Sequence, residues 1–70
     1  MFKTKLFTGG RTYHRGTYKT FPTALTEGQE DYNNYRNVLA MFGKQDTPHK
    51  MVIIAPDGKI IHTFTYNAHA

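Results

Sequence analysis

Histidine is the residue type in this chain that is best suited to catalysis or metal binding. The sequence holds four of them, at His14, His49, His62 and His69. Three imidazoles brought together would suit zinc or copper. None of the four forms the close pair in sequence that is typical of such sites, so we predict no metal site and no cofactor. We interpret the histidines as hydrogen-bonded or solvent-facing side chains.

Catalysis by a histidine requires a second titratable group beside it. His14 or His62 would have to be paired with Asp57 or Glu27, and nothing in the spacing of these residues brings them together. The chain also has no cysteine nucleophile and no phosphate-binding glycine loop. We therefore predict a binding protein rather than an enzyme.

Basic and aromatic residues interleave in the N-terminal third of the chain. They are Lys3, Lys5, Arg11, Tyr13, Arg15, Tyr18 and Lys19. Basic groups neutralise phosphates and aromatic rings stack on unpaired bases, so the pattern is consistent with nucleic-acid binding. That function requires the basic side chains to share one face of a sheet. The alternative is a solvated strand face on which lysine prevents edge pairing, and no nucleic-acid-binding motif is present.

A third candidate surface is apolar and lies in the C-terminal third. Residues 51–54 are Met, Val, Ile and Ile, and Ile60 and Ile61 follow shortly after. A strand that is apolar on both sides is normally covered on both sides. We therefore expect the second side of this hairpin to be covered either by the loop of residues 44–49 or by another molecule. The protein-binding surface that we predict comprises Phe7, Met51, Ile53 and Ile61.

The elements that position these residues can be predicted from periodicity. Residues 2–8 alternate as a strand does, which places Lys3, Lys5 and Phe7 on one face. The other face carries Phe2, Thr4 and Leu6. The glycine pair at 9–10 is a hairpin turn signal. Residues 11–21 form the second strand, in which Gly16 indicates a bulge or a bend.

A change of period after Pro22 predicts a helix over residues 24–42. Small and apolar residues recur there at steps of three and four, in a stripe of Leu25, Gly28, Tyr32, Tyr35, Leu39 and Phe42. Two start signals compete, because Pro22 suits a first turn whereas Thr26 and Gln29 have capping-box spacing. Gly43 is well suited to follow the last turn.

A second hairpin completes the order ββαββ. Its strands are residues 51–54 and 59–66, and its turn is residues 55–58. We predict one α+β domain over residues 1–70, with two layers, in which a single helix packs on a small antiparallel sheet. One helix covers one sheet face, so the other face meets solvent or a partner.

Composition further limits the class of protein to which the chain can belong. The chain has 70 residues, no cysteine and a formal net charge of +4. This length supports one core, the lack of cysteine excludes disulfides and thiolate metal sites, and the moderate positive charge favours anionic partners. No apolar run is long enough to span a bilayer and no secretory signal is present. We expect a cytoplasmic protein.

These observations together predict a small, basic, non-enzymatic protein that modulates or inhibits a larger macromolecule. We expect it to bind through the uncovered sheet surface, with a protein partner favoured over nucleic acid. A homodimer through the sheet is a further alternative.

Overall fold

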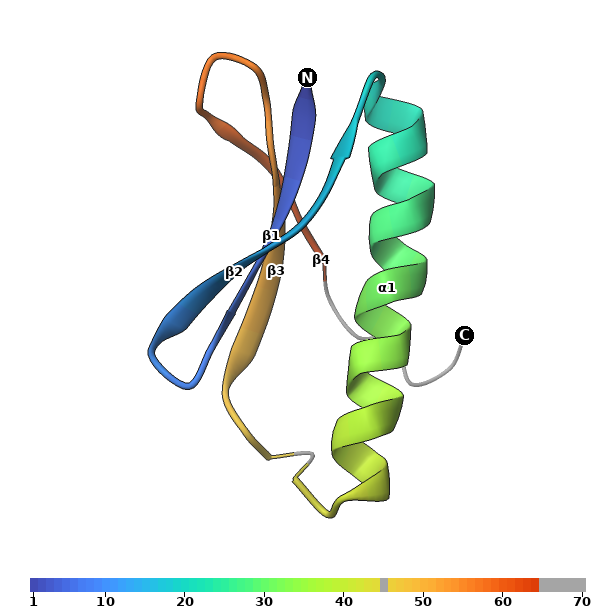
Figure 1. The fold of residues 1–70 in the computed structure, drawn as a ribbon, viewed down its shortest axis with the longest axis vertical. Coiled ribbons are helices and arrows are strands. Elements are labelled where there is room, and N and C mark those ends of the chain that lie inside the picture. The colour runs from blue at the N-terminus through green and yellow to red at the C-terminus, as the bar shows by residue number, and fades with distance from the viewer. Residues whose placement is uncertain (45, 65–70) are drawn as a thin grey trace.

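The computed structural model describes residues 1–44 and 46–64. One helix packs against a four-stranded antiparallel sheet, as Figure 1 shows. The elements are β1 (Phe2–Thr8), β2 (Arg11–Tyr18), α1 (Phe21–Met41), β3 (His49–Ile54) and β4 (Ile60–Phe64). The predicted two-layer α+β fold with the order ββαββ is therefore confirmed.

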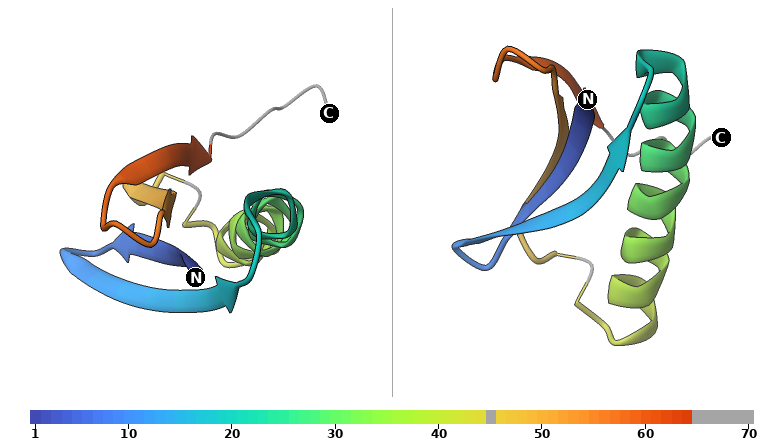
Figure 2. Two further views of the ribbon diagram at one scale, coloured as in Figure 1. Left: turned by 90° about the horizontal axis from the view of Figure 1, so that it is seen from above. Right: turned by 45° about the horizontal axis from the view of Figure 1, so that its top comes forward.

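The strand order in the sheet is β2-β1-β3-β4, which differs from the order in the chain. The two hairpins are joined side by side through β1 and β3, which pair antiparallel from Lys3 with Ile54 to Thr8 with His49. The edges of the sheet are therefore β2 and β4. Figure 2 shows that α1 lies against one face of the strongly twisted sheet.

Both hairpin turns form where the sequence predicts them. Gly9 and Gly10 have φ angles of 57° and 76°, and Thr8 pairs directly with Arg11. Two consecutive residues with positive φ are the requirement of the two-residue turn that matches strand twist. In the second turn Gly58 has a φ of 90°, and its N–H donates to the carbonyl of Ala55 at 2.9 Å.

The helix begins at Phe21 rather than at residue 24, so the predicted start is late. Thr20 is the N-cap, and its side chain accepts a hydrogen bond from the Thr23 N–H at 3.4 Å. Pro22 occupies the first turn, where its missing N–H costs nothing. The capping box at Thr26 is not used, because the helix has already begun.

The end of the helix follows the predicted glycine signal. Gly43 has a φ of 67°, and the Lys44 N–H turns back to donate to the Leu39 carbonyl at 2.8 Å. The Gly43 N–H donates to the Ala40 carbonyl at 3.1 Å. The first bond adds to the one that the Leu39 carbonyl accepts from the Phe42 N–H at 3.2 Å, and the second gives the Ala40 carbonyl a donor.

The core lies between α1 and one face of the sheet. Its buried members are Leu6, Ala24, Tyr32, Met51, Ile53 and Phe64. Gly28 allows the helix to approach the sheet closely, since a Cβ at this position would lie 2.5 Å from the Phe64 ring. The fold on this side therefore depends on the absence of a side chain at Gly28.

The last turn of α1 is not covered by the sheet. The predicted apolar stripe is correct as far as Tyr35, which packs against the core. It is wrong at Phe42, which is 71% exposed, and Val38 and Met41 are exposed as well. A 21-residue helix is about 31 Å long, so its C-terminal end extends past the strands in Figure 1.

The strand bounds differ from the predicted ones at three places. β2 ends at Tyr18 rather than at residue 21, and β3 begins at His49 rather than at residue 51. β4 begins at Ile60 rather than at residue 59. It ends at Phe64 within the described residues, and the predicted continuation over 65–66 lies outside them. No helix in the described ranges combines the length and the apolar character that crossing a membrane demands.

Candidate binding surface on the open face of the sheet

The sheet has one face that α1 does not cover, which we call the open face. Lys3, Lys5 and Phe7 of β1 alternate onto it, because Thr4 and Leu6 between them are buried toward the helix. The pairing register determines which residues of the other strands lie on the same face. Its further members are Thr12, His14, Thr17, Lys50, Val52, Ile54, Ile60, Ile61 and Thr63.

An aliphatic area occupies one corner of the open face. Ile54 pairs with Ile60 of β4, and the register then shifts so that Ile61 is an extra, bulged residue. Neither Ile60 nor Ile61 packs against the helix-side core, and they are 55% and 44% exposed. Because of the bulge, two adjacent isoleucines are presented on one side of an edge strand.

Val52 is a buried open-face residue next to this aliphatic area. It is fully buried although it is not a member of the helix-side core. Its cross-strand neighbours are Lys5 and Thr63, and no other described element lies on this side of the sheet in Figure 2. The aliphatic stem of Lys5 therefore helps to cover Val52 while its amine reaches solvent.

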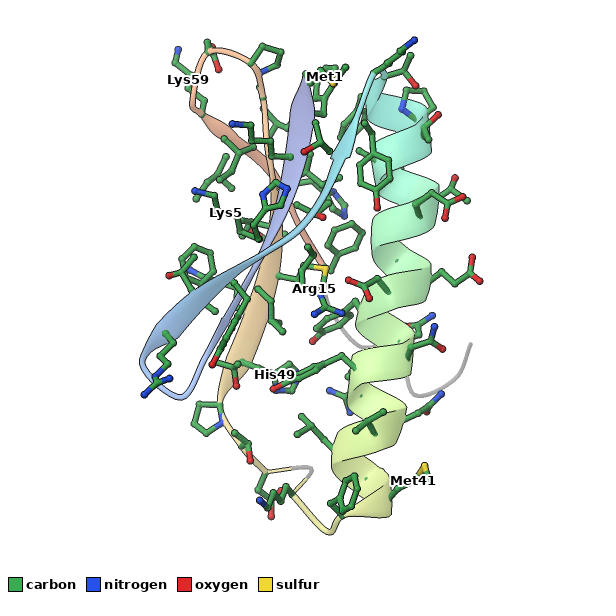
Figure 3. All side chains as sticks on the ribbon, in the orientation of Figure 1. Met1, Lys5, Arg15, Met41, His49 and Lys59 are labelled. Carbon is green, nitrogen blue, oxygen red and sulfur yellow. The ribbon has the colours of Figure 1, made fainter. Side chains whose placement is uncertain are left out.

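Positive charge concentrates on the sheet and negative charge on the helical layer. Residues 1–20 and 48–64 carry seven Lys and Arg and one Asp, whereas residues 21–47 carry two Lys and Arg and four Asp and Glu. The open face itself carries Lys3, Lys5 and Lys50 and no acidic side chain. Figure 3 shows Lys5 pointing away from α1, whereas Arg15 and His49 point toward it.

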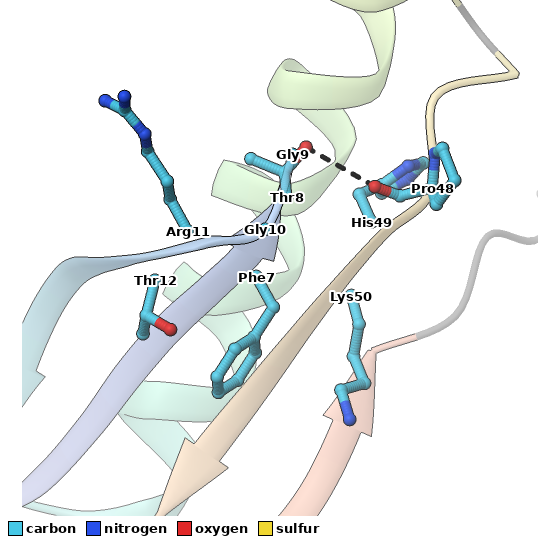
Figure 4. A pocket seen from close by; sticks show the side chains of 9 residues that line it. All are labelled: Phe7, Thr8, Gly9, Gly10, Arg11, Thr12, Pro48, His49 and Lys50. Atoms are coloured by element: carbon cyan, nitrogen blue, oxygen red, sulfur yellow. Dashed lines mark hydrogen bonds between the residues drawn. The ribbon is translucent and has the colours of Figure 1, made fainter.

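A shallow hollow lies at the glycine-turn end of the open face, and Figure 4 shows the residues that line it. Phe7 and Lys50 are paired across β1 and β3, and the Lys50 amine lies 5.3 Å from the centre of the Phe7 ring. An ammonium over an aromatic face is a favourable contact. A second hollow near the β3–β4 turn is lined by Lys3, Lys5 and Ile54, among others.

Two of the four predicted protein-binding residues lie on the wrong side of the sheet. Met51 and Ile53 are both 0% exposed and belong to the core under α1. The reason is the register, in which Met51 pairs with Leu6 and Ile53 with Thr4. They cannot contact a partner while the protein is folded. Phe7 and Ile61 lie on the open face, as a binding role requires.

The basic residues of the first hairpin do not share one face, contrary to what the nucleic-acid hypothesis requires. Lys3 and Lys5 lie on the open face, but Arg15 is a bulged residue that turns to the helix. Its guanidinium donates two hydrogen bonds to Asp31, at 2.9 and 2.8 Å. These bonds, and the charge of Asp31, raise the pKa of Arg15.

The other members of the predicted nucleic-acid set are scattered. Tyr18 pairs with Phe2 and packs against the helix-side core. Tyr13 pairs with the buried Leu6, so it also faces the helical layer. Arg11 pairs with Thr8 beside the glycine turn, and Lys19 follows the end of β2. The aromatic rings that would stack on bases therefore lie away from Lys3 and Lys5.

Each histidine that the structure describes has a local role. His49 connects the layers, since its Nε2 lies 3.2 Å from the Tyr32 hydroxyl and its Nδ1 2.7 Å from the Thr47 carbonyl. His62 packs edge-on against Phe64, and His14 lies 3.1 Å from the Thr17 hydroxyl. Within residues 1–44 and 46–64 no three His, Asp or Glu residues gather as metal ligands would. His69 lies outside the described residues.

The sequence placed Ile54 and Ile60 in the apolar hairpin but not in the predicted four-residue surface, and it did not identify Lys50. The alternation of Lys50, Val52 and Ile54 was a usable signal, because these residues are separated by two. It was concealed by the unbroken apolar run at 51–54, in which either face can be the inner one.

The chain was compared with protein-family models, with curated proteins and with solved structures, and none of them matches it.

Proposed function

We propose that this protein is a non-enzymatic binding protein of the cytoplasm that modulates or inhibits a larger protein by docking on it through the open face. The observation that carries the proposal is the aliphatic corner formed by Ile54, Ile60 and Ile61 on a sheet face that no described element covers. Exposed apolar surface with a basic border is typical of interaction sites.

A protein partner is favoured over nucleic acid. Binding of unpaired bases uses exposed aromatic rings beside basic groups, and Phe7 is the only Phe or Tyr on the open face among the described residues. The Lys50 amine lies over that ring. A protein surface is complemented by aliphatic side chains and lysines without stacking.

Capture from host-cell lysate tests the proposal, with nuclease treatment in parallel. We expect the immobilised chain to retain a protein after nuclease, and Ile61→Asp to lose it because the aspartate places a charge in the apolar contact. Met41→Asp is the matched control, since Met41 is 81% exposed at the free end of α1. Equal retention by wild type and Ile61→Asp would contradict a role for the open face.

A further inference from the structure

Three lysines of the open face form a line along the strands. Lys3 and Lys5 are successive open-face residues of β1, and Lys50 pairs with Phe7, the next such position. Successive residues on one face of a strand are about 7 Å apart. Lys3 and Lys5 therefore leave β1 about 7 Å apart, and Lys50 leaves the neighbouring strand β3 one step further along, about 14 Å from Lys3 in the strand direction.

The aliphatic residues lie beside this line rather than within it. Lys3 is followed across the sheet by Ile54 and Ile60, and Lys5 by Val52 and Thr63. The open face is thus divided into a basic band, formed by Lys3 and Lys5 of β1 with Lys50 of β3, and an apolar band, formed by the rest of β3 and by β4. A partner segment that complements the open face must carry an apolar strip with negative charge along one edge.

The lysines of the band have no carboxylate partner among the described residues. Within residues 1–44 and 46–64 the ion pair that forms joins Arg15 to Asp31, on the other side of the sheet. Glu27, Glu30 and Asp31 belong to α1, which lies against the other face of the sheet in Figure 2. The Asp57 carboxylate lies in the β3–β4 turn, where it accepts a hydrogen bond from the Lys59 N–H at 3.0 Å. The charge on the open face is therefore to be complemented from outside.

We propose that the open face docks an amphipathic helix of the partner that carries acidic residues along one edge, an inference that rests on the function proposed above. Acidic residues spaced four apart on a helix rise about 6 Å per step, close to the spacing of the lysines. A helix about 10 Å wide also fits across strands about 4.8 Å apart. The docked helix mirrors α1, so that both sheet faces are covered.

Two other occupants fit less well. A second copy has the same open face, whose charged groups are Lys3, Lys5 and Lys50, so it would supply no negative charge to complement these lysines. Single-stranded nucleic acid would match the charge but would leave the isoleucines against a polar backbone. Both remain outcomes that the experiment can return.

The experiment measures binding of two fluorescent 18-residue helical peptides by anisotropy. One has a leucine face with glutamates spaced four apart along its edge, and the other has lysines in place of the glutamates. We expect the full chain to bind the acidic peptide and not the basic one. An oligothymidylate probe and a sedimentation measurement of the free protein test nucleic acid and a second copy.

Paired variants locate the binding. Lys3→Glu/Lys5→Glu should weaken the acidic peptide about tenfold or more, and Lys3→Gln/Lys5→Gln should weaken it less. Lys19→Glu/Lys44→Glu changes the net charge equally away from the open face and should bind as wild type does. Thermal melts establish that each variant is folded.

The outcomes separate this inference from the proposed function. The inference is overturned if neither peptide binds, or if the two peptides bind alike. It is also overturned if the two charge-reversed pairs bind the acidic peptide alike. Tighter binding of the oligothymidylate than of the acidic peptide, or dimerisation of the free chain, would overturn it as well. If the lysate partner is lost by Ile61→Asp but kept by Lys3→Glu/Lys5→Glu, the open face is the binding site and the acidic helix is wrong. If Ile61→Asp keeps that partner, the proposed function itself fails.

Discussion

Gly28→Ala is expected to destabilise the protein, although alanine is the better helix former. In an exposed helix interior the same change stabilises by about 1 kcal/mol. Here the new Cβ would lie 2.5 and 2.9 Å from two atoms of the Phe64 ring and 3.3 Å from the Thr4 methyl group. Carbon atoms in contact lie about 3.5–4.0 Å apart, so the ring would have to move by about 1 Å.

The Phe64 ring has little room for such a movement. It is 2% exposed, it stacks against Tyr32 at 6.2 Å, and His62 packs edge-on at 4.9 Å. Overpacking of a core costs about 1–3 kcal/mol. With an overlap this large we take the upper value, and the helix propensity offsets about 1 kcal/mol of it. The expected net loss is about 2 kcal/mol.

Urea and thermal unfolding measure this loss. In a domain of this size it corresponds to a fall in Tm of about 10 °C. Asn34→Ala, at an exposed position of the same helix, is the control and should stabilise slightly. Phe64→Leu should destabilise alone but make Gly28→Ala less costly when combined. If Gly28→Ala raised the Tm as Asn34→Ala does, the close helix–sheet approach described here would be wrong.

Three further changes test separate contacts. Arg15→Met removes a partly exposed ion pair in which Arg15 makes two hydrogen bonds to Asp31. The free energy of unfolding should fall by about 0.5–1 kcal/mol. High salt should reduce this difference between wild type and variant in urea melts. Gly10→Ala forces an L-residue to a φ of 76° at a position where nothing obstructs the new Cβ. It should lower the free energy of unfolding by about 1 kcal/mol, and Gly10→Asn should lower it less. Equal Tm values for wild type and Gly10→Ala would contradict backbone strain. Tyr35→Phe removes the 2.8 Å hydrogen bond to the Thr8 hydroxyl and should cost about 1 kcal/mol in the same assay, whereas no loss would show that water replaces it.

The parts of the fold that depend on local sequence could be predicted. The glycine pair at 9–10 and Gly58 determine their turns through φ angles that other residues avoid, and Gly43 ends the helix for the same reason. The period of three and four identified Gly28, Tyr32 and Tyr35 as residues of the helix that face the sheet, although it missed the buried Ala24. These signals act over a few residues, so they are readable without the tertiary structure.

The candidate surface could be predicted only in part, because it depends on pairing between distant strands. The run at 51–54 is apolar throughout, and only its register with β1 determines that Ile53 is inside and Ile54 outside. The bulges at Arg15 and Ile61 interrupt the alternation, and a one-residue insertion reverses the faces of all later residues in the strand. The position of Arg15 against Asp31 of α1 is likewise a long-range contact.

The most direct test of the open face uses its isoleucine methyl groups. The chain has four isoleucines, Ile53, Ile54, Ile60 and Ile61, of which Ile53 lies in the core under α1 and the other three on the open face. Methyl-labelled protein is to be titrated with the partner captured from lysate. We predict shifts of the Ile54, Ile60 and Ile61 methyl signals with Ile53 nearly unchanged. Binding that leaves those three signals in place would contradict the proposal that the open face is the binding surface.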